Sequence, residues 1–335
     1  MKGRIRDWLL LALLGAVPAF AADRIGHIEF FGHKGLDVAR VRELLPVGEG
    51  DNYSDRTKSL VRQAVAKAIA KEPTDVAVIC CDEQGSRLLF IGLPGTSYKS
   101  FSYHPDPRRE DRLSPEILDL YGRLDPALEA AVRKGGDAAE EDDSRGYALI
   151  KDPTARALQL AVREWALQHE PELLRVLEFS SAAEHRRVAG DALGYARQSR
   201  DQILALACAA RDPDVGVRNN VTRALGVLVR SDSGLASYIQ PDTFVEMLNS
   251  GMWEDRNKAT GLLAQLTASR NPALLAKIRS VALDSLVEMA SWRRPSHAGF
   301  ARMVLGRIAG LSEDQLQDLA WNGPVETILD AVGRP

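Results

Sequence analysis

The chain has little of what marks a disulfide-rich, nucleic-acid-binding or membrane-spanning protein. It has three cysteines in 335 residues, too few for a disulfide framework. Its formal net charge is −3, and because a mildly acidic chain binds nucleic acid poorly we expect no nucleic-acid partner. After the first 21 residues no apolar run approaches a transmembrane helix in length, and we predict no integral membrane insertion.

Sequence motifs of catalysis are also missing, including those of nucleophilic hydrolases, zinc proteases, dithiol redox sites and phosphate-binding loops. The six histidines are scattered; His27 and His33 flank a predicted strand and are interpreted as surface residues. Cys80 and Cys81 are adjacent on a predicted strand, where side chains alternate between faces, so we expect no bridge between them. With Cys208 they are interpreted as small buried apolar residues. We predict no cofactor, no metal ion and no catalytic residue.

Residues 1–21 have the pattern of an export signal. Three basic residues precede an apolar run from Trp8 to Val17, which ends at the small-residue site Ala19-Phe20-Ala21. The run is about half as long as a membrane span requires. We predict cleavage after Ala21 and a soluble periplasmic or secreted protein, with an uncleaved short anchor as the alternative.

One helical pattern of apolar residues, at i, i+3, i+4 and i+7, occurs four times in the C-terminal half. Its central residues are Leu193, Leu225, Leu263 and Leu305, at steps of 32, 38 and 42 residues. This spacing is typical of helix pairs that stack into an α-solenoid. We predict a solenoid over 152–335, with a first helix from Pro153 and further helices at 172–180, 184–197, 201–210, 215–230, 241–249, 255–268, 273–290 and 297–309, then two short ones after Ser312.

The segment DPDVGVRNNVTRALG, residues 212–226, resembles the HEAT family of repeats. In that family an aspartate in the turn within a repeat precedes an arginine at the start of the second helix, and Asp214 and Arg218 occupy those places. The resemblance implies an acid–arginine ladder along the array. The ladder should fade toward the C-terminus, since the later copies hold Glu254-Asp255-Arg256 and then Ser296 and Ala298, whereas the first keeps Glu184 and Arg186.

Residues 24–94 differ from the repeats, because short β-rich runs flank two short helices. The order is β-α-α-β-β, with a closing hairpin around Gly85 and both helices able to cover one face of a three-stranded sheet. Ile25, Ile28, Phe30 and Gly32, the turn 48–54 and the hairpin resemble the POTRA family of the bacterial envelope. That resemblance implies polypeptide binding by addition of a strand to a sheet edge.

Residues 95–151 are predicted to connect the two parts. The segment 95–112 is polar and should be extended, and Ser114-Pro115 should begin a helix. We expect Pro126 to kink or split that helix. The acidic run 135–146 lacks the ligand spacing of a calcium loop and is interpreted as a solvated, mobile loop.

The predicted architecture is therefore mixed and mostly α: a POTRA-like domain followed by HEAT-like helix pairs, as in a group of uncharacterised exported bacterial proteins. It favours a non-enzymatic scaffold of the envelope that binds a protein or polypeptide at the sheet edge, the concave face of the solenoid, or both. Interface-prone residues lie near the starts of second helices: Arg218, Asn219, Trp253, Arg256, Asn257, Trp292 and Arg293. Tryptophans that merely fill gaps between repeats are the alternative for Trp253 and Trp292. The alternative function is an envelope enzyme, or a regulatory subunit of one, whose site forms only in three dimensions.

Overall fold

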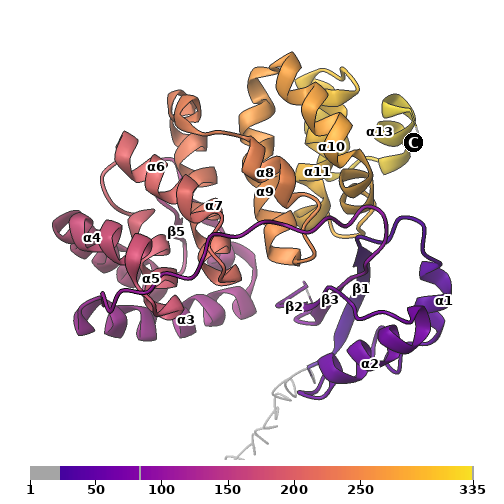
Figure 1. Ribbon diagram of the computed structural model, residues 1–335, viewed down its shortest axis with the longest axis horizontal. Helices are drawn as coiled ribbons and strands as arrows, with labels where there is room; N and C mark the ends of the chain where they lie inside the picture. The colour runs from indigo at the N-terminus through magenta and orange to yellow at the C-terminus, as the bar shows by residue number, and fades with distance from the viewer. Residues whose placement is uncertain (1–22, 83, 334–335) are drawn as a thin grey trace, which may run out of the picture.

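The computed structural model describes residues 23–82 and 84–333, and is mostly helical with a small sheet near the N-terminus (Figure 1). The predicted export signal lies outside the described residues. Within those residues, no helix has the combined length and apolarity that crossing a membrane requires.

The N-terminal part has the predicted β-α-α-β-β order. Its elements are β1 (Ile25–Phe31), α1 (Val38–Glu43), α2 (Thr57–Ile69), β2 (Asp75–Ile79) and β3 (Arg87–Gly92). Strand β3 is central, antiparallel to β2 as the hairpin requires and parallel to β1. Both helices cover one face, as predicted, because Val41, Val61 and Val65 pack in one buried cluster with Leu89 and Ile91.

The opposite face of the sheet packs against the long helical array. Ala77, Leu88 and Phe90 belong to the same apolar core as the helices. The ring of Phe90 lies 5.1 Å from that of Trp253 and 4.8 Å from that of Trp292. The sheet is thus covered by helices on both faces, and its core continues into the repeats.

The array consists of ten consecutive helices in the described chain, joined by short turns. They are α4 (Pro153–Phe179), α5 (Ala183–Leu193), α6 (Arg200–Ala209), α7 (Val215–Ser231), α8 (Asp242–Met247), α9 (Trp253–Leu266), α10 (Pro272–Ala290), α11 (Pro295–Ile308), α12 (Glu313–Trp321) and α13 (Val325–Val332). The boundaries follow the predicted ones closely, except that the first two predicted helices are joined in α4 across a non-helical His169.

The apolar pattern that defined the repeats forms the core of the array. All four central leucines are fully buried, as are the apolar residues four positions before them, Ala189, Val221, Ala259 and Ala301. Helix α5 packs on α7, α7 on α9 and α9 on α11, so each apolar stripe faces the next helix pair.

The connector is extended, as predicted, and is bonded to the array along its length. It crosses the turns within successive helix pairs: the amides of Lys99, His104 and Arg109 donate to carbonyls of Asn249, Arg211 and Phe179. In Figure 1 this segment runs across the array from the sheet to α3 (Pro115–Lys134). Separate folding of 24–94 remains a prediction, because no unfolding measurement bears on it.

Two expectations for the following segment were wrong. Helix α3 continues through Pro126 without a break. The lost hydrogen bond would have gone to the carbonyl of Gly122, an exposed residue, so water can bond that oxygen.

The acidic run is likewise ordered rather than a mobile loop. It contains a 3-10 turn (Gly136–Ala139) and β4 (Glu141–Asp142), which pairs with β5 (Leu149–Ile150). Arginines of α7 anchor it, because Glu141 pairs with Arg223 and Asp143 with Arg230.

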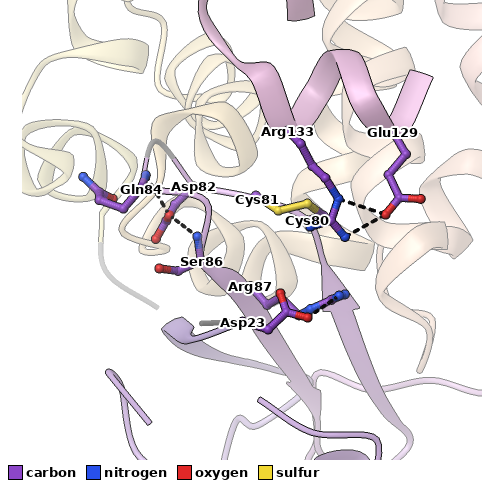
Figure 2. Close-up of a disulfide and its surroundings, with 9 residues drawn as sticks. All are labelled: Asp23, Cys80, Cys81, Asp82, Gln84, Ser86, Arg87, Glu129 and Arg133. Atoms are coloured by element: carbon purple, nitrogen blue, oxygen red, sulfur yellow. Dashed lines mark hydrogen bonds and ion pairs between the residues drawn. A yellow bond between two sulfur atoms is a disulfide. The ribbon is translucent and has the colours of Figure 1, made fainter. Parts of the chain in front are cut away.

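The cysteine expectations were also wrong. Cys80 and Cys81 form a disulfide with each other (Figure 2). Strand β2 ends at Ile79, so strand alternation does not apply to the two cysteines. Both are half-buried, and Cys208 is exposed, so none is the fully buried apolar residue that we expected.

Candidate binding groove

Arg218 and Arg256, two of the predicted partner-binding residues, lie inside the array. Arg218 donates to both carboxylate oxygens of Asp255 at 2.8 and 3.0 Å, and Arg186 does the same to Asp212 at 2.7 and 2.9 Å. Arg256 pairs with Glu288 at 3.3 Å. Each arginine therefore joins its own helix pair to the next, and these side chains are buried.

Each ladder arginine also satisfies a carbonyl in the turn before its helix. Arg186 donates to Ser180 O, Arg218 to Asp212 O, and Arg256 to Ser250 O, in every case six residues back. The acid and the carbonyl together replace the water that the buried guanidinium has lost. Arg218 and Arg256 are consequently structural, and neither is free to contact a partner in this state.

Trp253 and Trp292 are buried beneath the sheet. The indole nitrogen of Trp292 donates to Phe30 O at 3.0 Å, and the backbone amide of Trp253 donates to the carboxylate of Asp75 at 3.1 Å. Arg293 is exposed, but its guanidinium pairs with Glu29 and Glu49. These residues hold the chain's own N-terminal part.

Glu288 connects the ladder to the sheet. Its carboxylate accepts from the backbone amides of Gly32, His33 and Lys34 at 2.7, 2.9 and 3.0 Å. Gly32 has a φ of +71°, and a Cβ there would lie 2.5 Å from Leu93 O, so only glycine can turn these amides toward Glu288. The last acid of the ladder thus docks the end of β1.

Asn219 and Asn257 are half-buried on α7 and α9. The side chain of Asn219 donates to that of its neighbour Asn220 at 3.0 Å. Asn220, not Asn219, lines a cavity of about 940 Å³ between α3, α5 and α7.

One edge of the sheet is also occupied. On β1 the amide of Ile25 donates to Asp51 O at 2.8 Å, and Gly50 returns a bond to Ile25 O at 2.7 Å. Farther along, Phe30 O is bonded by Trp292. Addition of a peptide strand would therefore have to use β2, the other edge.

An open groove lies at the other end of the array, between α3, α4, α5, α7 and the β4–β5 segment. Its volume is about 940 Å³. The lining combines apolar and ionisable side chains: Leu118, Tyr121, Gly122, Asp125, Leu128, Val132, Ala139, Glu141, Ile150, Gln159, Glu184, Arg187, Val188, Asp191, Tyr195, Asn220 and Arg223.

The floor of the groove is held by a polar network. The hydroxyl of Tyr121 donates to Asp191 at 2.7 Å, so α3 is bonded to α5. The amide of Gln159 donates to the hydroxyl of Tyr195 at 3.1 Å, while its carbonyl oxygen accepts from Ile150 N at 2.8 Å. These bonds fix both tyrosine rings before any ligand binds.

Both arginines of the lining already have acidic partners. Arg223 pairs with Glu141, and Arg187 forms a bidentate pair with Asp214. Burial alone would lower the pKa of Arg223, but Glu141 and Asp191 raise it overall. Both arginines thus remain positively charged, and their acidic partners balance that charge.

The carboxylates are in excess. Burial in the groove, and then Asp191, raise the pKa of Asp125. Burial, with Asp191 beside it, raises the pKa of Tyr121 well above its usual value, so that tyrosine stays a neutral donor. Asp125 forms no ion pair among the described residues, whereas Glu184 lies close enough to Arg187 to raise the pKa of that arginine. The groove therefore presents negative charge beside apolar surface.

Next to the groove the sign of the charge reverses. Lys258 on α9 is half-buried, and burial followed by the nearby Arg223 lowers its pKa to about 8.

No cluster of three or more metal-ligating side chains occurs in the part of the chain that the structure describes.

None of the seven predicted contact residues lines the groove. Tyr121 and Asp125 lay in a segment that was interpreted as a connector. A signal did exist on the repeats: Arg187 and Asp191 are four residues apart on α5, and Asn220 and Arg223 are three apart on α7, beside the apolar stripes. These polar residues occupy matching positions on the neighbouring helices α5 and α7, and such a match indicates that they lie on one surface.

The comparisons with known proteins add no name to this geometry: no protein-family model, no curated protein and no solved structure matches the chain.

Proposed function

We propose that the protein is a polypeptide-binding scaffold whose site is the groove between α3, α5 and α7. The observation that carries the proposal is the groove itself. It is open, about 940 Å³ in volume, and lined by fixed tyrosines, carboxylates and apolar side chains rather than by a closed catalytic pocket. Wide mixed surfaces of this kind suit a chain segment better than a small substrate.

The proposal includes the architecture. Consecutive helix pairs with a buried arginine ladder support an α-solenoid of the HEAT kind, and the mixed sheet with two helices on one face supports the POTRA resemblance. An exported location, in the periplasm or outside the cell, belongs to the same proposal and rests on the pattern of residues 1–21.

Gly122 offers a way to test the site. It lies on the groove side of α3, and nothing lies within 4 Å of a Cβ added there. A photo-crosslinking amino acid at this position, in the cells that make the protein, should form an adduct with a polypeptide, identified by mass spectrometry. The matched control is the same amino acid at Asp119, an exposed α3 residue outside the groove lining.

A second arm uses Gly122→Trp, whose large side chain should fill the groove, and Gly122→Ala, which leaves it open. Gly122→Trp should abolish co-purification of the crosslinked partner, and Gly122→Ala should not. Absence of a polypeptide adduct at 122 above that at 119 would refute the proposed function. So would a partner that binds both variants equally.

A further inference from the structure

Resting on the proposed function, we propose that the groove selects extended segments in which an apolar residue lies two positions from a lysine or arginine. The cation would bind at Asp125 and Asp191, and the apolar side chain would pack on the apolar wall of α3. The partner is thus a cationic, partly apolar polypeptide segment.

The charge of the groove lining supports the binding of a cationic side chain. Four carboxylates, Asp125, Glu141, Glu184 and Asp191, face two arginines. Arg223 is neutralised by Glu141, and Arg187 by Asp214 outside the lining. The remaining carboxylates favour a positively charged side chain, and the lining offers no free cation to an anionic one.

Asp191 is less exposed than the carboxylates of a surface cluster. It is half-buried on α5, and one oxygen already accepts from Tyr121 at 2.7 Å. Its other oxygen and the neighbouring Asp125 remain for a ligand. A cation there would lie between two carboxylates.

The apolar half rests on α3. Leu118 lies about 10 Å before Asp125 along the helix axis, and Leu128 about 5 Å after it, at 1.5 Å of rise per residue. Side chains on one face of an extended peptide repeat every ~7 Å, since each strand residue advances about 3.3 Å. This ~7 Å spacing lies between the two distances, so an apolar side chain two positions from a cation at Asp125, in either direction along the peptide, falls within the span of this wall, where Leu118, Leu128, Val132 and Val188 line the groove.

Fluorescein-labelled peptides test the selection by fluorescence anisotropy with the full chain. The first probe repeats Lys-Ser-Leu-Ser; the others replace Lys by Gln, replace Lys by Glu, or replace Leu by Ser. The lysine–leucine peptide should bind about tenfold tighter than the glutamine peptide at low salt. The preference should shrink as added salt shortens the screening length. The glutamate peptide should bind weakest.

Asp125→Asn should weaken the lysine–leucine peptide about fivefold, as expected for one partly exposed charge pair, and leave the glutamine peptide unchanged. Asp119→Asn removes the same charge from the same helix outside the groove, and should change neither. Equal affinity for lysine and glutamine peptides, or equal effects of the two asparagine variants, would overturn the selection rule.

The arms separate this inference from the proposed function. If all peptides bind equally and Gly122→Trp still blocks them, polypeptide binding stands and the cation rule fails. If none binds and crosslinking at 122 finds no polypeptide, the proposed function fails. Spermidine that binds as tightly as the lysine–leucine peptide would overturn the rule in favour of a small cation.

Discussion

The two ends of the helical array differ in whether another part of the chain covers the helices. At the α9–α11 end the sheet covers the helices, and Trp253, Trp292 and Glu288 are used to hold it. At the α5–α7 end α3 and the β4–β5 segment cross the array without filling it, and a cavity of about 940 Å³ remains.

This difference shows what residue type alone does not distinguish. Tryptophan and arginine are frequent in interfaces, and here they do form one, but within the chain. The surface left open to other molecules is instead made of tyrosine, aspartate and leucine. Interface propensity therefore identified a real contact, which in this structure lies within the chain.

The largest expected effect concerns the ladder that both ends share. Arg218→Met leaves the buried carboxylate of Asp255 with only Ser250 as a side-chain donor, and should lower the free energy of unfolding by about 3–5 kcal/mol. The double variant Arg218→Met, Asp255→Leu removes both charges and should recover most of that loss. Urea denaturation checks both variants. A double variant no more stable than the single one would mean that the ion pair stabilises the fold by more than the mutual neutralisation of its two charges.

A core substitution should cost somewhat less. Leu225 is fully buried between α5 and α9, so Leu225→Ala should lower the free energy of unfolding by about 2–5 kcal/mol through the cavity that it leaves. Asn219→Ala, on the same helix but half-buried, should cost little. Thermal or urea unfolding giving equal losses would show that the assignment of α7's faces is wrong.

At the open end, adding a methyl group to α3 should increase the stability of the protein. Gly122→Ala places a methyl group where a Cβ meets no atom within 4 Å, in the interior of α3. The free energy of unfolding should rise by about 0.5–1 kcal/mol, because alanine favours the helix over glycine. A loss of stability in the same urea assay would indicate that the groove is closed in solution.

The smallest effect concerns the covered end and depends on pH. The hydrogen bonds from Arg293 are the main cause that lowers the pKa of Glu49 to about 2. A depressed carboxyl pKa stabilises the fold above the unfolded-state value near 4.5, and this contribution is lost as the pH falls through about 2. Glu49→Gln should therefore lower the urea midpoint slightly at pH 7 and by clearly less near pH 2, where the carboxyl is about half protonated. A difference that persists undiminished at low pH would contradict an ionic origin.

The fold was largely predictable because its signals are local and periodic. Apolar spacing located the helices of the repeats, and the central leucines Leu193 to Leu305 are buried as that spacing requires. Proline at the start of α3 and glycine in the hairpin similarly mark local geometry.

The site was not predictable, since it depends on contacts between distant segments. Glu141 is 82 residues from Arg223, and Tyr121 is 70 from Asp191. Neither pair leaves a periodic pattern in one sequence. The acidic run was interpreted as solvated for the same reason: its anchors lie on α7, far along the chain.

Hydrogen exchange on the full chain, with and without the lysine–leucine peptide, tests the contrast between the two ends most directly. The account predicts slower exchange on peptide binding in α3, α5 and the β4–β5 segment, and no change in β1 or α11. Protection confined to β2 and the α9–α11 end, with α3 unaffected, would contradict it.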